Sequence, residues 1–168
     1  MRRVTESEIR GSFVNASRRE ATQAAMPDLD TLDWDSLDFL GWTDTKFPGR
    51  SYVVAHLDGV ARGVLLRPAG ETKIRRKAMC VWCEDVKATD DVRMVVASLA
   101  GAAGRRGATV GTLTCTEFAC SRNVRREPSR SEIDDNAGAE ERAFWAEVRI
   151  EGLRKRVAHF IRRVMRDE

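Results

Sequence analysis

The four cysteines of the chain fall into two close pairs, a spacing that suits metal binding. Two residues separate Cys80 and Cys83 in MCVWCEDV, four separate Cys115 and Cys120 in TCTEFACSRN, and 31 residues lie between the pairs. Each pair can form a short chelating turn, and structural zinc sites are tetrahedral and often hold four thiolates. If folding joins the two pairs, metal binding adds to the stability of the fold. We therefore predict that these four cysteines bind one structural Zn²⁺ per chain.

Three other uses of the cysteines stay open at this point. A Cys-x-x-Cys redox pair normally begins a helix, whereas Cys80 and Cys83 follow a basic stretch and precede an expected strand. Buried cysteines without a ligand role are common, but all four falling in two tight pairs is not expected by chance. Structural disulfides are rare in the cytoplasm. The exchange Cys80→Ser separates a structural site, which predicts loss of folding, from a redox site, which predicts a folded but inactive protein.

The composition is that of a globular chain without a membrane or targeting segment. Hydrophobic residues make up 42% and charged residues 33% of the 168 residues, which is enough for one domain with a core. No apolar run approaches the ~18 residues of a membrane span. The N-terminal MRRVTESEIR lacks the apolar region of a secretory signal. We therefore expect a cytoplasmic protein that binds no membrane and forms a single domain over 1–168.

The common catalytic signatures are absent from the sequence. It contains no G-x-S-x-G, no H-E-x-x-H and no glycine-rich loop that ends in G-K-[ST]. Four thiolates would also leave zinc without the open position that catalytic zinc requires. The two histidines, His56 and His159, are expected to be structural or surface residues. The sequence therefore predicts a protein that is not an enzyme and has no small-molecule substrate.

Two β-hairpins are expected around the first cysteine pair. The dipeptide DG at 58–59 is favoured in hairpin turns and predicts strands at about 51–57 and 60–66. A second hairpin is expected with strands near 92–98 and 109–115, joined by a loop rich in glycine and arginine. A knuckle, a hairpin and a second cysteine pair before a helix follow one another in the order of a treble clef. The long gap between the pairs argues against a plain zinc ribbon.

Helices are expected at both ends of the chain. The segment 5–26 predicts one N-terminal helix, in which Thr5 and Glu8 have the spacing of a capping box. A C-terminal helix is expected over about 139–166, with Gly152 marking a break. One face of this helix carries an apolar stripe for core packing, formed by Leu153, Val157, Phe160, Ile161 and Val164.

Together these patterns predict an α+β domain of antiparallel β-hairpins with a treble-clef zinc finger, an N-terminal helix and a C-terminal helix. The helical and hairpin part is expected over about 4–70, the treble-clef part over about 75–126, and the C-terminal helix over about 139–166. The segment 28–44 contains acids and no bases. Its first part, 28–38, is expected to be a solvated loop from which Leu32, Leu37 and Phe39 pack inward. Although the net charge is only +3, arginine is frequent from Arg105 onward, which favours an acidic partner for the C-terminal part.

Five segments, in their order, resemble the elongation-factor-G-binding, or fusidic-acid-resistance-type, family. They are DWDSLDFLGWTD, YVVAHLDGVARGVLLRP, MCVWCEDV, AGAAGRRGATVGTLTC and FACSRNVRR, and the resemblance extends from about residue 4 to residue 165. It implies a treble-clef zinc finger with the four cysteines as ligands. It also implies binding to elongation factor G, the translocation GTPase, and release of that factor from ribosomes stalled by fusidic acid. The resemblance further implies that release occurs through binding, without modification of drug or factor.

Given this resemblance, the candidate contacts with the factor are the arginines of the Gly/Arg-rich loop and those that follow the last cysteine, namely Arg105, Arg106, Arg122, Arg125 and Arg126. A competing hypothesis is a zinc-containing RNA- or ribosome-binding protein without factor specificity, because zinc knuckles and clustered arginines are common in nucleic-acid-binding proteins. The low net charge and the lack of an RRM-like stacking motif favour the factor, and contact with ribosomal RNA is compatible with both. A zinc enzyme or thiol oxidoreductase is a third hypothesis.

Overall fold

The computed structural model describes residues 1–70, 77–87 and 89–165, so the first residues of the expected treble-clef part (75–76) and the last residue of the expected C-terminal helix (166) lie outside the described residues. A five-stranded antiparallel sheet in the order β1-β2-β3-β4-β5 forms the centre. Its strands are β1 (Leu40–Thr43), β2 (Ser51–Leu57), β3 (Val60–Pro68), β4 (Val92–Ser98) and β5 (Thr109–Cys115). The α+β class expected from the sequence is confirmed.

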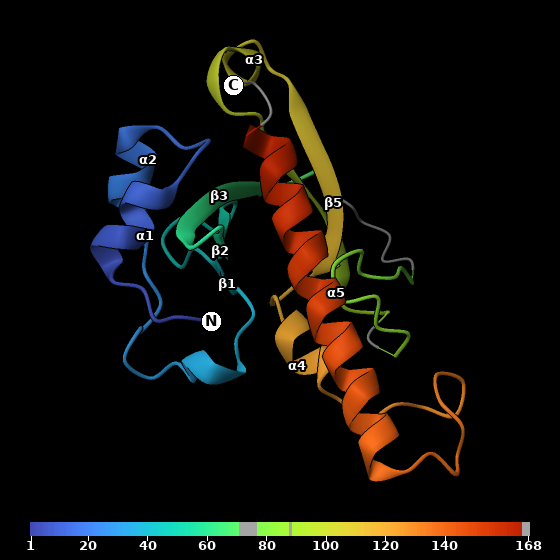
Figure 1. Ribbon diagram of the computed structural model, residues 1–168. Coiled ribbons are helices and arrows are strands. Elements are labelled where there is room, and N and C mark those ends of the chain that lie inside the picture. The colour runs from blue at the N-terminus through green and yellow to red at the C-terminus, as the bar shows by residue number, and fades with distance from the viewer. Residues whose placement is uncertain (71–76, 88, 166–168) are drawn as a thin grey trace.

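Helices cover both faces of this sheet. They are α1 (Glu6–Ser12), α2 (Arg18–Gln23), the short 3-10 helix η1 (Trp34–Ser36), α3 (Gly101–Arg105), α4 (Cys120–Val124) and α5 (Ala139–Met165). In Figure 1 the long helix α5 runs across one side of the sheet, and α1 and α2 lie on the other side. Within the described ranges, no helix has both the length and the apolar character needed to cross a membrane.

The inner strand β2 is buried on both faces. Successive side chains of a strand point to opposite faces of the sheet. Accordingly, Val53 and Ala55 belong to an apolar cluster with α5, whereas Tyr52 and Val54 belong to a second cluster with the N-terminal residues such as Ile9. This double burial explains why SYVVAHL reads as a nearly continuous apolar run instead of an alternating one.

Both expected hairpins are present. Asp58 and Gly59 have φ of 52° and 81°, as the tight turn between β2 and β3 requires. The second hairpin, β4 and β5, is also confirmed, but its glycine-rich connection contains the short helix α3. Gly104 of α3 cannot carry a side chain, because a Cβ there would lie 1.8 Å from the carbonyl oxygen of Leu99. Close packing therefore explains why glycine occupies position 104.

The single N-terminal helix predicted over 5–26 is wrong, because the segment forms two short helices. Thr5 begins α1 through the expected capping box with Glu8, and Ser17 begins α2 through a second capping box with Glu20. Between them, the amide of Val14 donates to the carbonyl oxygen of Gly63 in β3 (2.9 Å). Pairing with the sheet and the second cap therefore outweigh the continuous helical pattern.

The C-terminal helix is confirmed, but the break expected at Gly152 is not present. The helix α5 continues through this residue to Met165. The guanidinium group of Arg156 packs over Gly152, where a Cβ would lie 2.8 Å from Nη1. All five residues of the predicted apolar stripe are buried, at 0–4% exposure. The glycine therefore provides space for an arginine and does not end the helix.

The acidic segment 28–44 is not wholly solvated, because two of its carboxylates are buried. Asp44 is 1% exposed and accepts hydrogen bonds from the Tyr52 hydroxyl group (2.9 Å) and from the amides of Lys46 and Phe47 (2.8 and 2.9 Å). Burial opposes its ionisation, but these donors outweigh burial and lower the pKa of Asp44. Asp38, the second buried acid, pairs with Arg125 at the end of α4 and with Arg154 of α5.

Candidate metal centre

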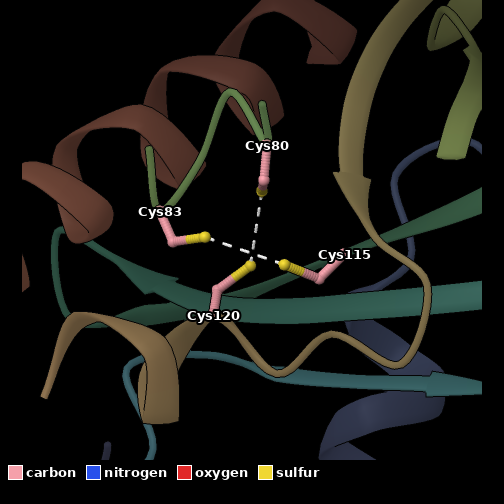
Figure 2. A group of neighbouring side chains, drawn as sticks. All are labelled: Cys80, Cys83, Cys115 and Cys120. Atoms are coloured by element: carbon pink, nitrogen blue, oxygen red, sulfur yellow. Dashed lines mark hydrogen bonds between the residues drawn. The ribbon is translucent and has the colours of Figure 1, made fainter. Parts of the chain in front are cut away.

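The structure brings the two cysteine pairs together through three elements. Cys80 and Cys83 lie in the turn that precedes β4, Cys115 is the last residue of β5, and Cys120 is the first residue of α4. Figure 2 shows the four sulfur atoms pointing toward one another beneath α5. The knuckle, the hairpin and the helix occur in the expected order, so the four-cysteine cluster is consistent with a treble clef.

The distances between the sulfur atoms fit a tetrahedral zinc site. All four Sγ atoms lie within 4.8 Å of one another, and the separations are 3.7 Å for Cys80–Cys120 and 3.7 Å for Cys83–Cys115. A tetrahedron with Zn–S bonds of about 2.3 Å has S···S edges of about 3.8 Å. The four cysteines are 0–1% exposed, and none forms a disulfide. The donor set therefore suits Zn²⁺ in a closed structural site.

The four thiols interact too strongly to ionise independently. Hydrogen bonds with Cys115 and the other sulfur atoms lower the pKa of Cys80, and the same group of contacts raises the pKa of Cys120. The first thiolate is stabilised by neighbouring S–H donors, but each further negative charge in this buried cluster opposes the next. A divalent cation removes this conflict, because its charge stabilises all four thiolates at once.

Main-chain and amide hydrogen bonds hold the ligand-bearing turns. Glu84, with φ of 51°, donates from its amide to the carbonyl oxygen of Cys80 (2.9 Å) and closes the knuckle. The side-chain amide of Asn123 in α4 donates to Cys115 Sγ (3.5 Å) and is 3.9 Å from Cys83 Sγ. Such outer contacts orient metal ligands and reduce the negative charge on sulfur. Sequence reasoning missed Asn123, although its place three residues after Cys120, one turn along a helix, was a usable signal.

Trp82, between the first two cysteines, belongs to the core. The residue is 1% exposed, and its ring lies 5.5 Å from the rings of Phe39 and Phe160 and 6.4 Å from that of Phe118. Its carbonyl oxygen accepts a hydrogen bond from Arg156 Nε (2.7 Å). The Trp82 side chain therefore anchors the metal-binding turn to the residue before β1, to the second cysteine loop and to α5, and does not face a partner.

Two buried acids connect α4 and α5 to the rest of the fold. The side chain of Asp38 is fully buried and accepts bonds from Arg125 and from Arg154 Nε (2.9 Å). Asp85, 2% exposed, pairs with Arg126 at 2.6 Å. Residues far apart in sequence form these pairs, so the sequence carries no local signal for them.

The predicted partner-binding arginines do not form one patch. Arg125 and Arg126 are engaged in the ion pairs with Asp38 and Asp85. Arg122 is exposed in α4, whereas Arg105 and Arg106 are exposed at α3. Figure 1 places α3 at one end of the molecule, well away from α4.

The two histidines lie outside the four-sulfur cluster. His56 is in β2, where its Nε2 accepts a hydrogen bond from Arg2 Nε (3.3 Å), and His159 is exposed on α5. The candidate metal site found among the described residues consists of cysteines alone.

Comparison with protein families assigns the metal centre to a known zinc-finger family. Residues 8–164 match the family described as FBP C-terminal treble-clef zinc-finger. Comparison with curated proteins and with solved structures gave no match. Four buried cysteines at zinc-binding distances, within a zinc-finger family, identify the cofactor as structural zinc. Because the match covers nearly the whole chain, the chain belongs to the FBP C-terminal treble-clef zinc-finger family of elongation-factor-G-binding proteins.

Proposed function

We propose that this chain is a zinc-stabilised binding protein that engages elongation factor G at the ribosome and promotes release of the factor, as fusidic-acid-resistance proteins do. The match of residues 8–164 to the family carries this proposal. The family consists of proteins that bind elongation factor G and are not catalysts. The proposed mode of action is therefore binding alone.

The closed metal centre supports a structural role for zinc. Four thiolates would complete the tetrahedron, and the four cysteines are 0–1% exposed. Zinc in this position would supply no site for a water molecule or substrate. It would instead join the knuckle, the end of β5 and α4 into one unit, with Asn123 orienting two of the ligands. The fixed surface around that unit is then available for a partner.

The exposed arginines give two candidate contact surfaces for the factor. In the described part of the chain, no side-chain ion pair engages Arg122 of α4 or Arg105 and Arg106 at α3. Arg125 and Arg126 act within the fold, where they hold α4 in place through Asp38 and Asp85. We retain all five arginines in the proposal, with the first three as direct contacts and the last two as residues that also fix the surface.

Isothermal titration calorimetry with purified elongation factor G tests the proposal. The zinc-loaded chain is expected to bind with one-to-one stoichiometry, and absence of binding at about 50 µM would contradict the proposal. The variants Arg122→Glu and Arg105→Glu/Arg106→Glu locate the contact, because each reverses charge at one of the two candidate surfaces. Arg18→Glu, on the exposed side of α2, is the matched control. Release is measured by sedimentation of ribosomes with bound factor and fusidic acid, with and without the chain.

The same sedimentation experiment addresses RNA binding without factor specificity. An RNA-binding protein would sediment with ribosomes that lack elongation factor G, and binding would weaken steeply with salt because counterions are released. The proposed function predicts instead that association with ribosomes depends on the factor.

A further inference from the structure

The outer edge of β5 offers main-chain groups for pairing. β5 is the last strand of the sheet. The amide of Thr116 donates to the carbonyl oxygen of Asp91 across the β4–β5 hairpin (3.0 Å). Hydrogen-bonded and non-hydrogen-bonded pairs alternate in an antiparallel ladder. Thr116 and Asp91 form a hydrogen-bonded pair, so every second residue of β5 counted back from Thr116 also pairs with β4. The main-chain groups of the residues between them, Thr109, Gly111 and Leu113, therefore point away from β4.

The knuckle covers only one end of this edge. The amide of Val81 donates to the carbonyl oxygen of Leu113 (2.9 Å). Gly111, two residues earlier, is exposed, and within 1–70, 77–87 and 89–165 its outward N–H and C=O groups have no hydrogen-bond partner. Space does not require glycine here, because a Cβ would meet Met94 Sδ at an ordinary 3.4 Å. The free part of the edge therefore runs over Thr109–Thr112.

A groove of about 630 Å³ lies between this edge and α5. Its lining includes Val81, Thr112 and Phe160. Its α5 wall carries four cations and a histidine, namely Lys155, Arg156, His159, Arg162 and Arg163. No carboxylate of the described residues lines the groove. The groove therefore combines free strand-edge groups with a wall of positive charge.

Part of this positive charge is not neutralised within the fold. Arg156 Nη1 pairs with Glu84 (3.0 Å), and Arg162 Nη2 reaches Asp58 (3.3 Å). Arg163, by contrast, is exposed and has no side-chain partner in the part of the chain that the structure describes. Arg163 is therefore available for an anionic group in the groove.

We propose that this groove binds an extended acidic peptide segment of a partner protein, which adds to β5 as a short strand. Its main chain pairs with the outward groups of Thr109 and Gly111. Because side chains alternate along a strand, every second residue faces the α5 cations and is acidic. The residues between them face the outer side of the hairpin, where Met94 is 44% exposed, and are apolar.

The groove fits a peptide better than a single nucleic-acid strand. Single-stranded nucleic acid is held by bases stacked on aromatic rings in a basic channel. The two aromatic side chains that line the groove, Trp82 and Phe160, are 1% and 4% exposed and offer no face for a base. The proposal is also separate from the binding of elongation factor G, since a free peptide tests it in the absence of that factor.

Fluorescence anisotropy with a labelled peptide of alternating glutamate and valine tests the charge pattern. This peptide is expected to bind the zinc-loaded chain at least about tenfold more tightly than a peptide of alternating lysine and valine. Arg163→Glu is expected to weaken binding of the glutamate peptide about tenfold. The matched charge reversal Arg18→Glu, in α2 on the opposite side of the sheet, is expected to leave binding unchanged.

Two further variants test the main-chain pairing. Gly111→Pro removes the outward N–H group, which the β4–β5 ladder does not use, and edge strands tolerate proline at such a position. Gly111→Ala keeps that group and is the control. Proline is expected to abolish detectable binding, and alanine to change affinity by no more than about twofold. Zinc content and circular dichroism verify that both variants fold.

A modified peptide keeps the test valid if the proline variant does not fold. Methylation of alternate amide nitrogens blocks pairing from the peptide side, and the methylated glutamate–valine peptide is expected not to bind. Equal binding of the methylated peptide, or of the lysine peptide, overturns the proposal. Tighter binding of a single-stranded RNA oligomer that is weakened by Arg163→Glu also overturns it, because the surface would then recognise phosphates.

Discussion

Asn123 acts on the metal centre without being a ligand. Its amide donates to Cys115 Sγ (3.5 Å) and lies 3.9 Å from Cys83 Sγ, so it stabilises negative charge on two sulfur atoms. We predict that Asn123→Ala lowers zinc affinity about 10- to 100-fold while the fold is retained at saturating zinc. Competition with a chromophoric chelator measures this affinity. Asn136→Ala, in an exposed loop, is the control, and equal affinities of the two variants would contradict the role of Asn123.

Asp38 is the buried acid on which α4 and α5 converge. It accepts bonds from Arg125 and Arg154 (2.9 Å for Arg154), and its amide donates to Ser121 Oγ (2.9 Å). We predict that Asp38→Ala lowers the free energy of unfolding by about 2 kcal/mol. The cost is moderate because the side chains of Arg125 and Arg154 are 28% and 53% exposed and can turn toward water.

Urea denaturation measures the cost at Asp38, and Asp35→Ala provides the comparison. Asp35 is exposed in the same acidic segment, so its loss should change stability by less than about 0.5 kcal/mol. Equal effects of the two substitutions would show that Asp38 contributes no more than a surface charge.

At the scale of elements, the strand β1 holds the second cysteine loop through one close contact. A Cβ on Gly41 would lie 2.6 Å from Cβ and Cγ of Phe118, which has a φ of 56° between Cys115 and Cys120. We predict that Gly41→Ala displaces this loop, lowers the free energy of unfolding by about 1–3 kcal/mol and weakens zinc binding. Thermal unfolding and zinc competition measure the two effects.

Gly49→Ala is the matched control for Gly41→Ala. A Cβ on Gly49 would meet no atom within 4 Å, and its backbone is not left-handed, so alanine should be neutral or slightly stabilising. A Gly41→Ala variant as stable as Gly49→Ala would show that Phe118 moves aside without cost to the loop.

The loop after α4 has a titratable anchor in Glu132. Burial opposes ionisation of Glu132, but bonds from Ser129 and from Arg126 Nη2 (2.8 Å) outweigh it and lower its pKa to about 2. The charged form is therefore favoured by folding. Its contribution to stability is complete above the ordinary pKa of 4.5 and is lost as the pH falls toward about 2.

We predict that Glu132→Gln removes this pH dependence. The difference in unfolding free energy between the natural chain and Glu132→Gln should be largest near neutral pH and shrink below about pH 4.5. Comparing two variants is necessary because acid also protonates zinc-bound thiolates. Glu140→Gln, which removes an exposed carboxylate from α5, is the control for the loss of a surface charge. If the difference in unfolding free energy between the natural chain and Glu132→Gln did not change with pH, the lowered pKa of Glu132 would be contradicted.

Sequence patterns predicted the strands and helices that depend mainly on neighbouring residues in the chain. The turn at 58–59 and the β-branched runs predicted four strands, and the apolar stripe predicted α5. β1 was missed because only four residues form it and their partner is β2. The division of the N-terminal helix depends on a hydrogen bond from Val14 to Gly63, which no local pattern contains. The cysteines were predictable from their spacing, whereas Asp38 and Asp85 were not, because their arginine partners are distant in sequence.

At the scale of the whole molecule, the two apolar clusters share strands and so cannot be independent. Val53 and Val64 contribute to the cluster that contains the four cysteines, while the adjacent Tyr52 and Leu65 contribute to the cluster beneath α1. Loss of order on one face of β2 and β3 therefore removes the support for the other face. The metal centre is joined by packing to the N-terminal half of the chain.

We therefore predict that removal of zinc by a chelator destabilises both clusters together. The midpoint of thermal unfolding should fall by about 20 °C or more, because zinc binding contributes to folding free energy. Hydrogen exchange resolves the two faces. Amide protection should fall in β2 residues such as Tyr52 as well as in β4 and β5, and re-addition of zinc should restore it. Protection that persists in β2 and α1 after β4 and β5 have lost theirs would show two separable folding units. Elemental analysis of the untreated chain should give one zinc for each chain. This result establishes that thermal unfolding and hydrogen exchange both compare a zinc-loaded chain with a zinc-free one.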